Sequence, residues 1–369
     1  MNDAYRPDDL KERNDGFKWA EAGAGVIPAW IADMDLPTAP EVIEALRRRA
    51  GGDLGYPAWL DKPNAGPLAE AFAERMAGRY GWSPDPSLVR SFNDLNQALQ
   101  VLLQVWTRPG DGVAVHTPAY HPFLTTLQFM ERPLHPIQAE PDGDSWRFEV
   151  PDLSGCRVLL LVNPHNPTGR VFTREELTEL AELAERHDLL VISDEIHADL
   201  TFEPHRHIPF ATLLPERTVT ITSATKAFNL GGIRCSVAHL GHQGVRKALE
   251  AQPPFVYGSA NLFGVEATVA AWRHGDAWLE RTRALLDRNR HTIAARLPET
   301  FGYRIPQATY LAWLHVGRAG MAEVIEREAK VLLTDGAGFG PGGAEYVRLN
   351  FATTEPILAE ILNRLARIH

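Results

Sequence analysis

Two continuous apolar runs separated by an amphipathic stretch constrain the fold of this chain more than any other feature. The runs are residues 158–162 and 189–192, and each is typical of a strand buried on both faces of a sheet. Between them, residues 173–176 (Thr-Arg-Glu-Glu) form a capping box that predicts the start of a helix. Apolar residues then recur at helical spacing: Leu177, Leu180, Ala181 and Ala184. A strand–helix–strand unit of this kind predicts an α/β fold with parallel strands.

Other segments predict further elements around this unit. The β-branched alternation of residues 218–222 predicts a strand, and Thr38-Ala39-Pro40-Glu41 predicts a helix start capped by Thr38. Further predicted strands cover residues 113–115, 308–314 and 347–351, and further predicted helices cover 66–81, 276–297, 321–329 and a stretch that ends at Trp106. The length of 369 residues favours two domains over one.

Polar side chains follow several of the predicted strands. Residues 163–169 (Asn-Pro-His-Asn-Pro-Thr-Gly) follow the first buried run, and residues 193–197 (Ser-Asp-Glu-Ile-His) follow the second. Tyr120 follows the strand at 113–115, and Lys226 follows the strand at 218–222. Ligands of α/β sheets bind at the carboxyl ends of the strands, so we expect these side chains to share one rim.

The stretch from Thr222 to Arg234 holds one lysine, Lys226, close to hydroxyl groups and an arginine. Such a lysine can form a Schiff base with an aldehyde cofactor, while Ser223 and Arg234 can bind its phosphate. An isolated S-x-x-K motif is more often a surface lysine in a polar turn. Residues 91–97 form a polar loop that opens a helix, and this loop is either a phosphate site or an ordinary helix cap.

Composition argues against several other classes of protein. The formal net charge of −10 disfavours nucleic-acid and membrane-surface partners, which require basic patches. The two cysteines, Cys156 and Cys235, form no motif typical of a disulfide scaffold or a metal site. Residues 1–13 lack the apolar core of a secretory leader, and the aliphatic runs are too short to span a bilayer. We therefore expect a cytoplasmic protein without a metal or a membrane contact.

Two aspartates in the N-terminal apolar segment, Asp33 and Asp35, are interpreted as turn or capping residues.

The order and spacing of the polar motifs resemble those of the fold-type I pyridoxal 5′-phosphate (PLP) enzymes, the aspartate aminotransferase superfamily. The motifs are Asn166-Pro167-Thr168-Gly169, Asp194, Ser223-x-x-Lys226, Arg234 and Arg348. The resemblance implies an aspartate-aminotransferase-like α/β fold. Its large PLP-binding domain, residues 48–280, would have a mainly parallel sheet sandwiched by helices. A smaller α/β C-terminal domain would cover residues 281–369, and residues 1–47 would pack on it.

The resemblance also implies a role for each site residue. Lys226 looks like the Schiff-base lysine, Asp194 would face the pyridine nitrogen, and Asn166 and His197 would face the phenolic oxygen. The phosphate would be bound by Ser223, Arg234 and the backbone amides of Leu95 and Asn96. Tyr120 resembles the ring stacked on the cofactor, and Lys226, Asp194 and Tyr120 form the expected catalytic set. Substrate would be bound by Arg348, which resembles the arginine that grips the α-carboxylate, and by Asn166, Ile31 and Tyr120.

Tyr56 is similar to the tyrosine that reaches the phosphate of a neighbouring subunit. The resemblance therefore implies a homodimer with shared active sites. Whether Tyr257 or Asn261 also enters the partner's site is left open.

Longer motifs resemble the MalY/PatB-type cystathionine β-lyases. They are residues 30–35 (Trp-Ile-Ala-Asp-Met-Asp), 163–167, 193–199 and 226–230. The implied reaction cleaves the Cβ–S bond of cystathionine or another cysteine S-conjugate to a thiol, pyruvate and ammonia. One departure lies at residues 94–96, which read Asp-Leu-Asn where that family has a glycine and two valines. This change is compatible with a specialised branch in secondary-metabolite or antibiotic biosynthesis.

Two other functions are compatible with the same residues. A PLP-dependent aminotransferase, or an enzyme that decarboxylates or deaminates a related S-conjugate, would use the same lysine, aspartate and arginine. Its products would distinguish it, because transamination requires an amino acceptor. A non-catalytic regulator that binds a protein partner is the third alternative, and it would not need Lys226, Asp194 and Arg348 together.

Overall fold

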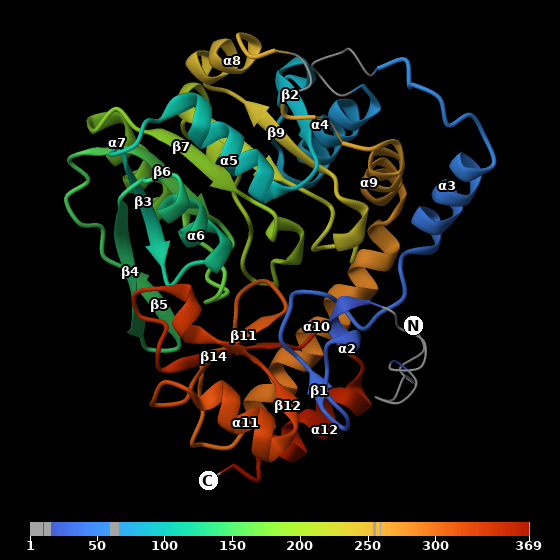
Figure 1. Cartoon of the computed structure of the whole chain (residues 1–369), viewed down its shortest axis with the longest axis vertical. Helices are drawn as coiled ribbons and strands as arrows, with labels where there is room; N and C mark the ends of the chain where they lie inside the picture. Colours follow the sequence, from blue (N-terminus) through green and yellow to red (C-terminus); the bar gives the residue numbers. More distant parts are fainter. Residues whose placement is uncertain (1–9, 11–15, 60–65, 254–255, 259, 369) are drawn as a thin grey trace.

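The computed structural model describes residues 10, 16–59, 66–253, 256–258 and 260–368. Its central element is an eight-stranded sheet with the strand order β2-β9-β8-β7-β6-β3-β4-β5 (Figure 1). These strands are β2 (Val89–Phe92), β3 (Gly112–Thr117), β4 (Leu134–Asp142), β5 (Ser145–Phe148), β6 (Cys156–Val162), β7 (Leu190–Asp194), β8 (Thr218–Thr222) and β9 (Ser236–Leu240). The strands expected at 113–115, 158–162, 189–192 and 218–222 are therefore confirmed, as is the α/β fold class.

Strand direction places the ends of distant segments at one edge of this sheet. Neighbouring strands β3, β6, β7 and β8 run parallel to one another. Strand β9 is antiparallel to both β8 and β2. Strand β2 therefore points the same way as β8, and β9 begins at the edge where β2, β3, β6, β7 and β8 end.

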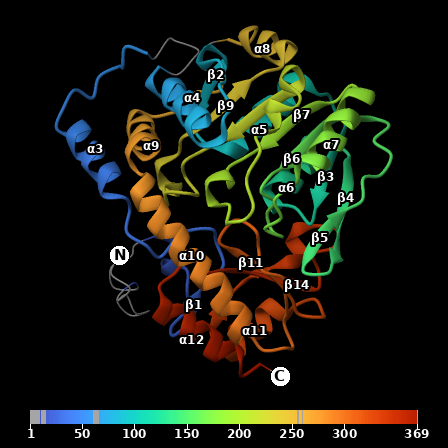
Figure 2. The same ribbon diagram turned by 180° about the vertical axis from the view of Figure 1, so that it is seen from behind.

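Helices cover both faces of the large sheet because its central strands are apolar on both sides. Along β6, Val158, Leu160 and Val162 join one core with helices α5 (Leu95–Trp106), α6 (His121–Phe129) and α8 (Gln243–Glu250). Leu159 and Leu161 join a second core with helix α7 (Arg174–Arg186), which covers the opposite face (Figure 2). Each such buried aliphatic side chain contributes on the order of 2 kcal/mol of hydrophobic stabilisation.

A smaller antiparallel sheet lies below the large one in Figure 1. Its strand order is β10-β11-β14-β13, and a separate parallel pair joins β1 to β12. The strands are β1 (Ile27–Pro28), β10 (Gly302–Tyr303), β11 (Leu311–His315), β12 (Val331–Leu332), β13 (Thr334–Asp335) and β14 (Tyr346–Asn350). Strand β1 thus attaches the N-terminal segment to the C-terminal part of the chain. The domain boundaries at 47/48 and 280/281 stay predictions.

The remaining helices connect and flank the sheets. Helix α10 (Asp276–Arg296) runs diagonally from the large sheet to the small one (Figure 2). The others are α2 (Phe17–Ala20), α3 (Pro40–Ala50), α4 (Pro67–Tyr80), α9 (Leu262–His274), α11 (Met321–Ala329) and α12 (Glu355–Leu365). Short 3-10 helices are η1 (Pro86–Leu88), η2 (Ala198–Leu200), η3 (Phe210–Thr212), η4 (Pro215–Arg217), η5 (Gly231–Ile233) and η6 (Gly336–Phe339). Among the described residues, no helix is both long and apolar enough to cross a bilayer.

Local predictions succeed at one helix start and fail at another. The capping box at residues 173–176 is confirmed, with both reciprocal hydrogen bonds present. The cap predicted at Thr38 is wrong, because Ala39 is the N-cap residue of α3 and no side chain caps it. Pro40 takes the first helical position, which suits its fixed φ, and this leaves Glu41 one position too early for a reciprocal box.

Two further boundaries differ from the predictions. Ser91 and Phe92 belong to strand β2 rather than to a loop, because they pair with Val237 and Ser236 of β9. The strand predicted from residue 308 begins only at Leu311. Thr309 has a φ of 73°, which is incompatible with a strand, and Ala308 donates its N–H to Gly169 instead. The leader prediction for residues 1–13 concerns positions that, apart from residue 10, lie outside the described residues.

Candidate active site

The rim of the large sheet gathers polar side chains from six segments. Tyr120 follows β3, Asn166 follows β6, Asp194 ends β7, and Ser223 and Lys226 follow β8. Arg234 precedes β9, which begins at this rim because it is antiparallel to β8. The sixth segment is the start of α5, which follows β2. Strand direction thus accounts for the common location of residues that lie more than 100 positions apart.

Lys226 is the half-buried amine at this rim. Its Nζ donates a hydrogen bond to the carbonyl oxygen of Ala32 at 3.0 Å. Burial lowers the pKa of Lys226 to about 8, and the positive charge of Arg348 lowers it further, whereas Asp33 opposes the shift. An amine with this pKa is readily deprotonated near neutral pH, as a nucleophile or a general base requires.

Asp194 is a buried carboxylate at the carboxyl end of β7. Burial raises its pKa to about 7, and the neighbouring charge of Glu195 raises it further. Its Oδ1 accepts a hydrogen bond from the N–H of Ile196 at 3.0 Å. Glu195 points elsewhere and is held by Nε2 of His207 at 3.0 Å. Asp194 is therefore a carboxyl group whose proton affinity is tuned to neutral pH, which is typical of functional sites.

His197 is a second buried group at the rim with unused hydrogen-bonding capacity. Burial lowers its pKa to about 3, so the imidazole is neutral at physiological pH. Its Nδ1 is buried and has no hydrogen-bond partner among the described residues. A buried polar atom of this kind indicates a place for an additional polar group.

Arg348 approaches the rim from β14 of the small sheet. Its Nη1 donates to Oδ1 of Asn166 at 3.2 Å, and its Nη2 donates to the carbonyl oxygen of Trp30 at 3.3 Å. The guanidinium lies 5.0 Å from the ring centre of Phe339. Its Nε has no partner within the part of the chain that the structure describes, although it is buried. Burial lowers the pKa of Arg348 to about 10, so the group stays cationic and suits a carboxylate ligand.

The start of helix α5 and the segment around Arg234 form a candidate phosphate cradle. Leu95 and Asn96 occupy the first two helical positions, where N–H groups have no acceptor within the helix. Ser223 Oγ donates to the carbonyl oxygen of Cys235 at 2.6 Å. The guanidinium of Arg234 forms an ion pair with the carboxylate of Asp94. Helix N-termini and arginines bind phosphate groups, and here a carboxylate of the chain already occupies part of that position.

Tyr120 lies beside this cradle at the start of α6. Its hydroxyl interacts with the side chain of Asn96, and burial raises its pKa. The ring also packs at 5.3 Å, centre to centre, against Phe123. Tyr120 therefore presents a fixed aromatic ring at the same edge as Lys226 and Asp194.

Residues 31–35 contact the site through backbone carbonyl groups, whereas the only site role predicted from the sequence in this segment was substrate binding by Ile31. The carbonyl oxygen of Ala32 accepts hydrogen bonds from Lys226 and from the Tyr310 hydroxyl, the latter at 3.0 Å. Nδ2 of Asn350 donates to the carbonyl oxygens of Ile31 and Asp33, both at 2.6 Å. The position of Asn350, two residues after Arg348 on the same face of β14, was the available signal.

Asp33 and Asp35 were predicted to be turn or capping residues, and the structure gives both of them interactions with lysine side chains. Burial raises the pKa of Asp33, and its charge interacts with Lys226. Asp35 forms a buried ion pair with Lys18 at 2.9 Å and accepts a hydrogen bond from Nε1 of Trp19 at 2.7 Å. The capping interpretation of Asp35 is therefore wrong, because a distant lysine and tryptophan take its carboxylate.

Three further residues lie away from this cluster or at its margin. Tyr56 is 91% exposed, so its predicted role depends on a second subunit and stays a prediction. Tyr257 is buried, and its carbonyl oxygen accepts a hydrogen bond from Nε2 of Gln97 at 2.8 Å. Asn261 caps α9 and donates to the carbonyl oxygen of Ile233 at 2.9 Å.

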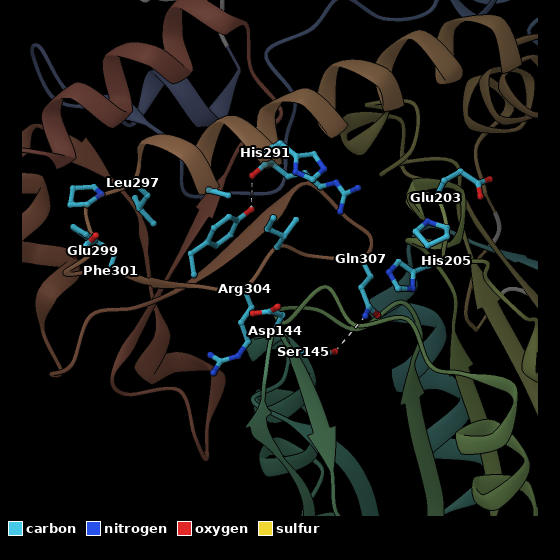
Figure 3. Close-up of a pocket in the computed structure, with 16 residues that line it drawn as sticks. Asp144, Ser145, Glu203, His205, His291, Leu297, Glu299, Phe301, Arg304 and Gln307 are labelled. Carbon is cyan, nitrogen blue, oxygen red and sulfur yellow. Dashed lines mark hydrogen bonds between the residues drawn. The ribbon is translucent and has the colours of Figure 1, made fainter.

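A separate pocket of about 770 Å³ lies between the β4–β5 turn and helix α10 (Figure 3). Asp144 and Ser145 line it from the turn, and Arg290 and His291 line it from α10. Figure 3 shows Gln307 directed toward Ser145, at a distance of 3.4 Å between Nε2 and Oγ. None of the site residues predicted from the sequence lines this pocket.

Comparisons with known proteins give full-length matches. Residues 31–365 match the family described as aminotransferase class I and II. Cystathionine beta-lyase of Corynebacterium glutamicum is 32% identical over 371 residues, which cover 98% of each protein. The crystal structure of OvoB has a TM-score of 0.90, with 31% identity and 96% of each chain covered. The PLP-bound C-S lyase of Staphylococcus hominis has a TM-score of 0.87, with 26% identity over 98% of this chain and 97% of that chain.

Proposed function

The chain belongs to the class I and II aminotransferase family, and we propose that it is a PLP-dependent carbon–sulfur β-lyase. Its substrate would be L-cystathionine or another L-cysteine S-conjugate, and its products would be a thiol, pyruvate and ammonia. The observation that carries the lyase assignment is the similarity to a cystathionine beta-lyase over 98% of both proteins. The geometry of the rim supports the same proposal.

The residues at the rim fit PLP in three respects. Lys226 offers an amine whose lowered pKa of about 8 favours reaction with an aldehyde. The unpaired buried Nδ1 of His197 and the Asn166 amide offer polar contacts for the ring oxygen. Ser223, Arg234 and the first N–H groups of α5 would bind the phosphate. When bound, PLP withdraws electrons from the substrate and so makes bonds at its Cα easier to break.

The protein's own side chains would then divide the work of binding and proton transfer. Arg348 would bind the substrate α-carboxylate, with its guanidinium oriented by Asn166 and by the carbonyl oxygen of Trp30. The Nζ of Lys226 would take the proton from Cα, since its free amine is accessible near neutral pH. The carboxylate of Asp194 would hold a proton on the pyridine nitrogen.

The proposal is tested by the products of the purified protein with L-cystathionine. We expect stoichiometric pyruvate and thiol without any added keto acid, and no product with Lys226→Ala. A visible absorption band that requires Lys226 would report the cofactor independently of turnover. Cofactor binding without pyruvate from any cysteine S-conjugate would exclude the lyase function.

Transamination is the second candidate, favoured by the family that the chain matches. It predicts that a keto acid is consumed in proportion to substrate and that no thiol is released. A decarboxylating branch predicts carbon dioxide instead. Measuring pyruvate, thiol, keto acid and carbon dioxide in one reaction therefore distinguishes all three.

We also propose a homodimer in which Tyr56 serves the neighbouring subunit. Leu54, Tyr56 and Val256 are large apolar side chains that are more than half exposed. Their exposure supports a surface that a second subunit covers in solution. Light scattering should give twice the chain mass of 41.0 kDa. Tyr56→Ala should weaken PLP binding without lowering thermal stability, whereas Phe129→Ala, which also removes an exposed ring, should affect neither.

The proposed location is the cytoplasm. Both cysteines, Cys156 and Cys235, are free thiols, which suits a reducing compartment. Fractionation of the producing cells should recover the protein with other cytoplasmic enzymes, and recovery with membranes would contradict this location.

A further inference from the structure

Asp94 lies where the start of helix α5 and the side chain of Arg234 meet. Its Oδ1 accepts a hydrogen bond from the N–H of Gln97 at 2.9 Å, which makes Asp94 the N-cap of α5. Its Oδ2 forms an ion pair with Nη2 of Arg234. One carboxylate therefore takes one N–H group of the helix N-terminus and the guanidinium of Arg234, two features that would otherwise attract a phosphate.

The backbone on either side of Arg234 is held in place by other contacts. Ser223 Oγ donates to the carbonyl oxygen of Cys235 at 2.6 Å, and Asn261 Nδ2 donates to that of Ile233 at 2.9 Å. The side chain of Arg234 is 58% exposed, whereas that of Asp94 is 24% exposed. The guanidinium is thus the movable member of the pair, and it can turn from Asp94 toward another anion while its backbone stays fixed.

We propose that Asp94 is an internal competitor for the phosphate of the cofactor and that it lowers the affinity of this chain for PLP. A phosphate at the cradle must either separate Arg234 from Asp94 or lie beside an uncompensated carboxylate. Both outcomes reduce the net gain from binding, because charge-assisted hydrogen bonds are exchanged rather than added. The inference rests on the proposed PLP cofactor but not on the lyase reaction.

The decisive variant is Asp94→Asn, because asparagine caps helices about as well as aspartate but carries no charge. The cofactor-free protein is titrated with PLP, and binding is followed by intrinsic fluorescence and by the visible absorption band. We expect the dissociation constant of PLP to fall roughly tenfold, the amount associated with one charge-assisted hydrogen bond. Asp94→Ser, a second neutral cap, should act in the same direction.

Two controls separate the phosphate effect from other effects. Pyridoxal, which lacks the phosphate, should bind to Asp94→Asn and to the unmodified protein with equal affinity. Asp85→Asn changes another N-cap aspartate, which accepts from the N–H of Ser87 at 2.8 Å, and should leave PLP affinity unchanged.

The possible outcomes distinguish this inference from the function on which it rests. Equal or weaker PLP binding by both neutral variants would overturn the role of Asp94 alone. A similar gain with pyridoxal would also overturn it, because the effect would not depend on the phosphate. Absence of PLP binding by every form of the protein would overturn the cofactor assignment and this inference together.

Discussion

Nη1 of Arg348 donates a hydrogen bond to Oδ1 of Asn166 at 3.2 Å and so joins the small antiparallel sheet to the rim of the large sheet. The two residues are 182 positions apart, and both are buried. Together with the carbonyl oxygen of Trp30 and the ring of Phe339, the contact orients a buried guanidinium, whose Nε has no partner among the described residues. Binding of the substrate carboxylate would therefore depend on both sheets at once.

Arg348→Lys tests this arrangement because it keeps the positive charge but removes the planar fork. We expect kcat/KM for L-cystathionine to fall by roughly 10- to 100-fold, mainly through a higher KM, as one or two charged hydrogen bonds are lost. Steady-state kinetics measure the change. Arg174→Lys, on the exposed start of α7, is the matched control and should leave both constants unchanged.

Asp194→Asn should change the pH dependence of stability. Burial raises the pKa of Asp194 from 3.8 to about 7 in the folded protein, so the folded state binds its proton more tightly than the unfolded state. Below pH 4 this carboxyl is protonated in both states and does not lower the free energy of unfolding. As the pH rises to 7, it lowers the free energy of unfolding by an increasing amount. Asp194→Asn removes this effect and the proposed catalytic carboxylate together.

Urea unfolding of the cofactor-free protein at pH 5 and pH 8 measures the effect. The stability gained by Asp194→Asn should be larger at pH 8 by about 3 kcal/mol, because the effect of the carboxyl grows by roughly 1.4 kcal/mol per pH unit between pH 5 and the folded pKa of about 7. Pyruvate formation should meanwhile fall at least 100-fold. A gain of equal size at both pH values would contradict the raised pKa.

Lys226→Met should stabilise the cofactor-free protein while abolishing activity. Burial lowers the pKa of Lys226 from 10.5 to about 8, so below pH 8 the folded state holds a buried charge that the unfolded state exposes. The buried charge lowers the free energy of unfolding by its largest amount at pH 7, and this effect disappears as the pH rises from 8 to 10.5.

The free energy of unfolding should therefore rise by up to about 3 kcal/mol at pH 7, with a smaller gain at pH 10. The lost hydrogen bond to Ala32 reduces this gain. Lys247→Met, at an exposed position of α8, should show no such pH dependence. If Lys226→Met were less stable than the original protein at pH 7, burial of the Lys226 charge would not lower the stability of the folded protein.

Asp199→Ala should destabilise the protein strongly. The carboxylate of Asp199 accepts a hydrogen bond from Nε of Arg75 at 2.9 Å and from the Tyr80 hydroxyl at 2.6 Å, and it lies 3.1 Å from Nε of Arg79. Arg75 is almost fully buried, so its charge would lose its principal partner. We expect a loss of about 3 kcal/mol in the free energy of unfolding.

Asp188→Ala is the matched comparison for this network. Asp188 pairs with Arg217, but its side chain is 73% exposed, so we expect a loss below about 1 kcal/mol. Equal losses for Asp199→Ala and Asp188→Ala in urea unfolding would contradict the assignment of a buried network between α4 and the segment after β7.

Much of the fold could be predicted because burial leaves a local pattern in the sequence. Continuous apolar runs and one capping box were sufficient to place β6, α7 and β7, since strands buried on both faces cannot carry polar residues there. The motifs at the strand ends also placed Asn166, Asp194 and Lys226 at one rim. Local signals failed where tertiary contacts decided the outcome, as at Thr38 and at the pairing of Ser91 with β9.

The sequence by itself determined the class of fold, the positions of its main strands along the chain and the family resemblance. Only the tertiary structure decided which distant groups meet: Lys226 with Ala32, Arg348 with Asn166, and Asp94 with Arg234. Periodicity reports whether a residue is buried, but it carries no information about which segment is packed against it. Those partners depend on the order of the strands in the sheet and on the packing of residues 30–35 and of strand β14 against its rim.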